Sequence, residues 1–110
     1  MPYLGLEELD REKYYPLLRK IVRGIEKESL RITKDGRLSQ MSHPISLGSA
    51  LTHDSITTDY SEALLELITP PNENIDGCLK SLSEIHNFIY RNIGDEILWT
   101  TSMPCVVDGE

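Results

Sequence analysis

Residues 21–33 alternate regularly between two sets of side chains, and this period of two residues is the pattern of an extended strand. One set places two glutamates among apolar residues, whereas the other contains three bases. Because apolar side chains mark the interior, we expect the basic face to meet water and the glutamates to point inward, one pleat repeat apart. The acidic face comprises Val22, Gly24, Glu26, Glu28, Leu30 and Ile32, and the basic face comprises Ile21, Arg23, Ile25, Lys27, Ser29 and Arg31.

The segments on either side of this strand carry helix and turn signals. Residues 6–20 have helical spacing that Pro16 interrupts, so we expect two short helices, the second starting at the proline. The Lys-Asp-Gly-Arg sequence of residues 34–37 predicts a turn. Residues 39–55 are polar and rich in turn formers, which predicts irregular structure with a short helix after Pro44.

The second half of the chain predicts another extended segment followed by a long helix. Residues 56–69 are extended in pattern and are stopped by Pro70. Residues 74–93 have the clearest helical period, with Asn74 as N-cap and Gly94 at the C′ position. The expected buried stripe of this helix comprises Ile75, Leu79, Leu82, Ile85 or His86, Ile89 and Ile93.

Length and charge limit the classes of protein. The 110 residues correspond to one small domain, and the mixture of patterns predicts an α+β fold. Eighteen acidic and eleven basic residues give a net charge of −7, which argues against nucleic acid or an anionic membrane as the partner. No apolar stretch approaches the ~18 residues of a membrane span, and charges occupy the start of the chain, where a signal sequence needs an apolar run. We therefore expect a cytoplasmic protein.

The inward glutamates require a chemical explanation. An ionised carboxylate in a dry interior is costly, so it is neutralised, paired with a base or bound to a metal ion, and two adjacent carboxylates increase the cost. Oxygen ligands select hard cations such as Mg²⁺ or Mn²⁺. Two simpler explanations remain open: Glu26 and Glu28 could be edge-strand charges that deter aggregation, or they could pair with Arg23 and Arg31.

Asp59 and Glu66 form a second acidic pair in the other extended segment. Their separation of seven residues would place them on opposite faces of an unbroken strand. They can converge only if the segment contains a bulge, a kink or a helical part. Glu62 shares the strand face of Glu66 and is a rival ligand.

Four ordered blocks of the sequence closely resemble the N-terminal region of the bacterial glutamate–cysteine ligases, from about Arg23 to Cys105. The blocks are RGIEKESLRIT, HPISLGSALTH, SITTDYSEALLELITP and HNFIYRNIGDEILWTTSMPC. The resemblance implies an antiparallel sheet curved into a funnel, related to glutamine synthetase, with flanking helices. It also implies an enzyme that uses ATP and Mg²⁺ to join the γ-carboxylate of glutamate to the amine of cysteine through a γ-glutamyl phosphate, the first step of glutathione synthesis.

The same resemblance assigns roles to individual residues. It implies that Glu26, Glu28, Asp59 and Glu66 are metal ligands, with no proton-transferring residue among them, and that Tyr60 lines the pocket for the cysteine side chain. Family members are several times longer, so residues 1–110 would be a single N-terminal segment of the catalytic domain, incomplete and inactive alone. The alternatives are a non-catalytic Mg²⁺-binding or assembly fragment that joins a separately encoded remainder, a small domain with structural carboxylates, and a related glutamate–amine ligase.

Overall fold

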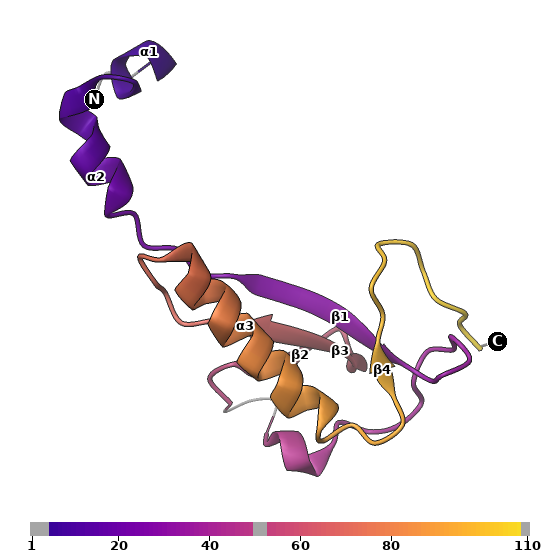
Figure 1. The fold of residues 1–110 in the computed structure, drawn as a ribbon. Helices are drawn as coiled ribbons and strands as arrows, with labels where there is room; N and C mark the ends of the chain where they lie inside the picture. The colour runs from indigo at the N-terminus through magenta and orange to yellow at the C-terminus, as the bar shows by residue number, and fades with distance from the viewer. Residues whose placement is uncertain (1–4, 50–52, 109–110) are drawn as a thin grey trace.

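The computed structural model describes residues 5–49 and 53–108, so Ala50, Leu51 and Thr52 of the predicted irregular stretch lie outside the described residues. The described chain contains a four-stranded sheet in the order β2-β3-β1-β4, and α3 lies across one face of it (Figure 1). The elements are α1 (Leu6–Leu9), η1 (Glu12–Tyr14), α2 (Tyr15–Arg19), β1 (Glu26–Ile32), η2 (Ile45–Leu47), β2 (Ile56–Asp59), β3 (Ser61–Ile68), α3 (Ile75–Tyr90) and β4 (Ile97–Leu98).

The sheet is antiparallel throughout, as predicted. β1 pairs with β3 from Glu26 opposite Ile68 to Leu30 opposite Leu64, and the end of β1 pairs with β4 on its other side. The expectation of one extended segment over residues 56–69 was wrong, because β2 and β3 form a hairpin. The chain reverses at Tyr60, whose φ of 53° lies in the left-handed region that few non-glycine residues adopt.

Four shorter-range predictions are confirmed. Pro16 lies in the first turn of α2, where its missing N–H costs no hydrogen bond. The turn over residues 34–37 is closed by the Thr33 amide, which donates to the Arg37 carbonyl at 2.8 Å. A short 3-10 helix, η2, follows Pro44. The Asn74 side chain caps α3 by accepting a 2.8 Å hydrogen bond from the Asp76 amide.

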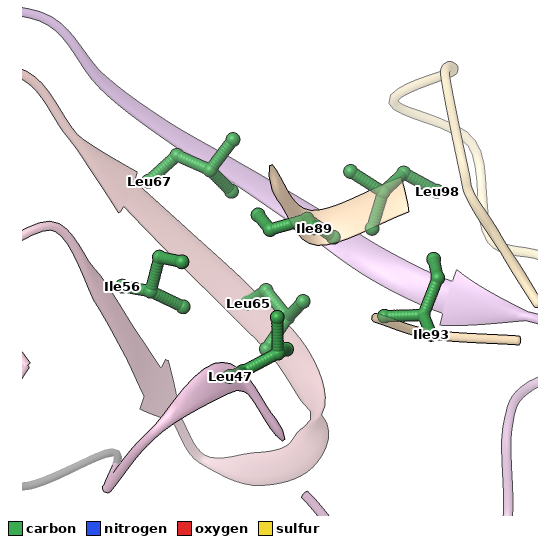
Figure 2. Close-up of a cluster of buried hydrophobic side chains, with 7 residues drawn as sticks. All are labelled: Leu47, Ile56, Leu65, Leu67, Ile89, Ile93 and Leu98. Atoms are coloured by element: carbon green, nitrogen blue, oxygen red, sulfur yellow. The ribbon is translucent and has the colours of Figure 1, made fainter. Parts of the chain in front are cut away.

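Helix α3 buries the second half of the predicted stripe, where Leu82 and Ile85 pack against the core and Ile89 and Ile93 belong to it, but not the first half. Ile75 and Leu79 are more than half exposed, whereas Cys78 is buried and donates its thiol to the Arg23 carbonyl. The helix ends at Tyr90, so Gly94, with φ 64°, belongs to the following turn and not to the C′ position. Ile89 lies at the centre of the core, which Figure 2 shows between the helix and the sheet. The core cluster comprises Leu47, Ile56, Leu65, Leu67, Ile89, Ile93 and Leu98.

The two faces of β1 are reversed relative to the expectation. Arg31 is fully buried and Ser29 is 5% exposed on the face that meets α3, whereas Glu26 and Glu28 are exposed on the opposite, open face. Burial of the basic face is tolerated because its charged groups have partners: the Lys27 ammonium lies 2.8 Å from Ser29 Oγ, and both terminal nitrogens of Arg31 donate to acceptors from several segments, although Arg31 Nε has no partner among the described residues. The apolar side chains that the sheet gives to this layer come from the other strands: Leu65 and Leu67 of β3, Ile56 of β2 and Leu98 of β4.

The N-terminal helices lie apart from the sheet. Neither α1 nor α2 contains a buried residue, and both project from one end of the molecule (Figure 1). Within the described ranges, no helix combines the length and the apolar character that crossing a membrane requires.

Candidate metal centre

Glu28 and Glu66 lie directly opposite each other on the open face of the sheet. They are Cα partners in the antiparallel β1–β3 pair, and side chains opposite each other in such a pair are close neighbours, separated by about 5 Å at Cβ. Like charges in this position destabilise the sheet unless something offsets them.

Asp59 joins this pair through the hairpin. The β2–β3 register shifts between Thr58 and Asp59, and Asp59 then pairs with Ser61 across the reversal at Tyr60. As a result, carboxylate oxygens of Glu28, Asp59 and Glu66 all lie within 4.8 Å of one another. The prediction that Asp59 and Glu66 need a break in the strand in order to converge is confirmed.

Glu26 lies next to this trio but outside it. It precedes Glu28 by one pleat repeat on the same face and is not among the residues whose oxygens lie within 4.8 Å of one another. Its charge still acts on the trio. The pKa of Glu66 is raised, first by burial and then by the negative charges of Glu26, Glu28 and Asp59. The site is therefore electrostatically unfavourable as it stands.

No base within the described residues offsets this charge. None of the four carboxylates forms an ion pair there, and the hypothesis that Glu26 and Glu28 pair with Arg23 and Arg31 was wrong. Arg23 donates to the Glu73 carbonyl at 3.1 Å, and Arg31 donates to the Glu96 carboxylate at 2.5 Å. Both contacts lie away from the trio.

Glu62, the rival ligand, is not a member of the trio. Its carboxylate accepts a 3.3 Å hydrogen bond from the His43 amide. Tyr60 is fully exposed at the tip of the hairpin, adjacent in sequence to Asp59. The structure therefore places Tyr60 beside the centre, and its role in a substrate pocket stays a prediction.

A groove of about 380 Å³ adjoins Glu28 and was not predicted. Its walls include Leu30 and Leu64, which are Cα partners one pleat repeat beyond the Glu28–Glu66 pair, together with Trp99 and Met103. The Trp99 indole donates to the Met103 carbonyl at 2.6 Å, which closes the loop that forms the far wall. The only signal for it in the sequence was the turn-rich loop WTTSMPC, because loops on a rigid scaffold often carry functional residues.

The donor set fits a hard divalent cation. The trio offers only oxygen ligands, and it gathers negative charge that no described base offsets. With one oxygen from each residue, it would leave about half of the octahedral positions of Mg²⁺ to water or phosphate. A divalent ion held at such a site can stabilise the charge on a phosphoryl oxygen and orient a phosphorylated substrate.

Comparison with known proteins identifies the family. The family model for glutamate–cysteine ligase matches residues 6–110. The chain belongs to the glutamate–cysteine ligases, a family of carbon–nitrogen ligases, as the sequence blocks predicted. It is 60% identical over 90 residues to the glutamate–cysteine ligase of Alcanivorax borkumensis, covering 82% of this chain and 17% of that protein. It is 51% identical over 98 residues to the glutamate–cysteine ligase of Saccharophagus degradans, covering 89% of this chain and 18% of that protein.

Two solved structures share the fold. The glutamate–cysteine ligase of Francisella tularensis in complex with AMP matches with a TM-score of 0.76 and 46% identity, over 79% of this chain and 18% of that one. A bifunctional glutathione synthetase from Pasteurella multocida matches with a TM-score of 0.81 and 36% identity, over 86% of this chain and 13% of that one. The predicted fold class, part of the antiparallel sheet of the glutamine synthetase-like ligases, is confirmed. The chain spans less than a fifth of the length of these relatives.

Proposed function

We propose that this chain supplies a metal-binding part of an ATP-dependent ligase that joins the γ-carboxylate of L-glutamate to the amine of L-cysteine through a γ-glutamyl phosphate, the first step of glutathione biosynthesis. Family membership supports the reaction type. The observation that carries the proposal is the Glu28–Asp59–Glu66 trio, whose oxygens lie within 4.8 Å of one another without a base to offset their charge.

In this proposal Glu28, Asp59 and Glu66 hold a Mg²⁺ or Mn²⁺ ion, and Glu26 holds a neighbouring ion on the same face. Bound ions would offset the negative charge that gathers when a phosphoryl group passes to a carboxylate. The carboxylates themselves transfer no proton; they orient the ions and keep them at the sheet. The AMP complex of the Francisella tularensis relative supports a nucleotide as co-substrate.

The position of Tyr60 supports a role in binding the cysteine side chain. Its ring is fully exposed next to Asp59, so it is free to contact a substrate at the metal centre. Its left-handed backbone is a costly conformation that functional sites often contain.

The remaining parts of the active site would come from beyond residues 1–110, which we interpret as one N-terminal segment of the catalytic domain in a cytoplasmic enzyme. The described residues offer no base near the trio for the phosphates of ATP. We therefore expect the isolated 110-residue chain to form no γ-glutamylcysteine from ATP, glutamate and cysteine.

A titration with Mn²⁺ tests the metal centre directly. Free Mn²⁺ is followed by electron paramagnetic resonance in the wild-type chain and in Glu66→Gln, with Glu62→Gln as the matched control on the same strand. We expect Glu66→Gln to lose at least about tenfold in affinity, since it removes one charged ligand, and Glu62→Gln to bind as the wild type does. Equal binding by all three proteins would refute the proposed centre.

A further inference from the structure

The tip of the β2–β3 hairpin extends past the backbone ladder that joins β3 to β1. The ladder ends at the Leu30–Leu64 pair, whereas β3 begins at Ser61. β3 holds β2 in register as far as the Thr58–Leu65 pair, but the register shifts before Asp59, which pairs with Ser61 in the tip. Asp59 is therefore the first residue of β2 beyond the part of the sheet that is anchored to β1, and a contact that anchors the tip helps to fix its distance from Glu28.

The side chain of Arg31 continues the connection where the ladder stops. Its guanidinium is fully buried, and Nη2 donates to the Glu62 carbonyl at 2.9 Å, in the part of β3 that does not pair with β1. The same group is fixed by acceptors from two other loops. These further acceptors are the Met41 carbonyl at 2.8 Å, the Ser42 carbonyl at 3.3 Å, Ser39 Oγ at 3.2 Å and Glu96 Oε1 at 2.5 Å.

We propose that Arg31 is a positioning residue of the metal centre: through the Glu62 carbonyl it holds the hairpin tip, and therefore the Asp59 carboxylate, at the separation from Glu28 that one ion requires. This inference rests on the proposed metal-binding function. Arg31 never contacts the ion, because its side chain lies on the face of β1 opposite Glu28. The role needs the planar guanidinium, whose five donors reach several acceptors at once, and a lysine ammonium of similar charge does not reproduce that fork.

Mn²⁺ affinity of the full 110-residue chain provides the first test. We expect Arg31→Lys to weaken Mn²⁺ binding by about ten- to a hundredfold, as losses of groups that orient metal ligands typically do. Ile89→Val serves as the control, because it loosens the core beneath α3 without touching the hairpin tip, and we expect it to bind Mn²⁺ with wild-type affinity. An Arg31→Lys chain that is folded by circular dichroism and binds with wild-type affinity would overturn the inference.

A double-mutant cycle separates positioning from general destabilisation. We expect Asp59→Asn to weaken binding strongly in the wild-type background but by no more than about twofold in the Arg31→Lys background, where Asp59 is already displaced. Glu28 lies on the same strand as Arg31, so Glu28→Gln should weaken Mn²⁺ binding by the same factor in both backgrounds. Full additivity of Arg31→Lys with Asp59→Asn would refute the positioning role even if the wild-type chain binds Mn²⁺.

The outcomes distinguish this inference from the proposed function. If wild-type binding is insensitive to Glu28→Gln and Glu66→Gln, the metal centre itself is refuted and the role of Arg31 with it. If Arg31→Lys does not fold, the double variant Arg31→Gln/Glu96→Gln replaces it, because it leaves no unpaired buried charge yet still loses the guanidinium that reaches Glu62. The same coupling to Asp59 is expected, and its absence contradicts the inference.

Discussion

Lys27 and His86 connect the central strand to the long helix, with 3.0 Å between Lys27 Nζ and His86 Nε2. The contact requires a neutral imidazole that accepts from the ammonium. Burial and the charge of Lys27 both lower the pKa of His86, and burial lowers the pKa of Lys27. His86 also stacks on Tyr90 one turn further along α3. A protonated imidazole in this position would face a second cation.

The first prediction concerns acid stability. Because the pKa of His86 is lowered in the folded state, its contribution to stability is present above its ordinary value of 6.5 and is lost as the pH falls through the lowered folded value. We expect the free energy of unfolding to decline more steeply just below pH 6.5 in the wild type than in His86→Gln. Urea unfolding between pH 5 and 7.5 measures this, with His43→Gln as the control. Parallel pH profiles for wild type and His86→Gln would contradict it.

The second prediction concerns the proposed metal centre in the absence of metal ions. The pKa of Glu66 is raised above its ordinary 4.5, so its favourable contribution to folding exists while it is protonated and is lost as the pH rises through the raised value. In EDTA at pH 7, Glu66→Gln should therefore be more stable than the wild type, and the difference should vanish near pH 4. Added Mg²⁺ should reverse the order, because only the intact trio gains binding energy. Denaturant unfolding with and without Mg²⁺ checks both statements, and Glu62→Gln should follow the wild type throughout.

The third prediction concerns the buried ion pair of Arg31 and Glu96. Removing one partner leaves an uncompensated charge in the interior, so Arg31→Met should lower the free energy of unfolding by about 3–5 kcal/mol. The exposed pair of Arg37 and Asp35 is the control, because Arg37→Met should cost no more than about 1 kcal/mol. Thermal unfolding of both variants measures these losses of stability. If both variants lose similarly little, the interior tolerates the unpaired carboxylate of Glu96 and the prediction is wrong.

The fourth prediction tests how much of the predicted stripe of α3 contributes to the core. Ile89 is completely buried and Ile75 is 59% exposed. Ile89→Ala should cost about 2–5 kcal/mol through lost burial and the cavity left behind, whereas Ile75→Ala should change stability by about 0.5 kcal/mol or less. The same urea experiment measures both, and equal losses would show that the predicted stripe is buried along its whole length.

Local signals in the sequence predicted much of the fold. Pro16, the turn over residues 34–37 and the Asn74 cap are determined by bonds within a few residues, and the structure has them all. The family resemblance was confirmed, and the convergence of Asp59 with Glu66 was predicted on the condition of a break.

The remaining features depend on contacts that a pattern of hydrophobicity does not contain. Arg31 was predicted to face water, because its five acceptors come from two loops and from β3, and the pattern of residues 21–33 contains no sign of them. The reversal at Tyr60 was missed because tyrosine is a poor turn former and a favoured strand residue. The two-residue strand β4 is too short to produce a periodic signal.

Lys27 lies between Glu26 and Glu28 in the sequence but on the other side of the sheet, and this alternation protects the pairing register. A slip of one residue in β1 would turn every side chain to the opposite face. Lys27 would then neutralise Glu66 and Asp59, so charge alone would favour the wrong register. Two glutamates would, however, enter the layer beneath α3, and Arg31 would lose all its acceptors. Correct pairing of this strand is therefore enforced from the buried side, which leaves the open face able to gather repelling carboxylates without misfolding.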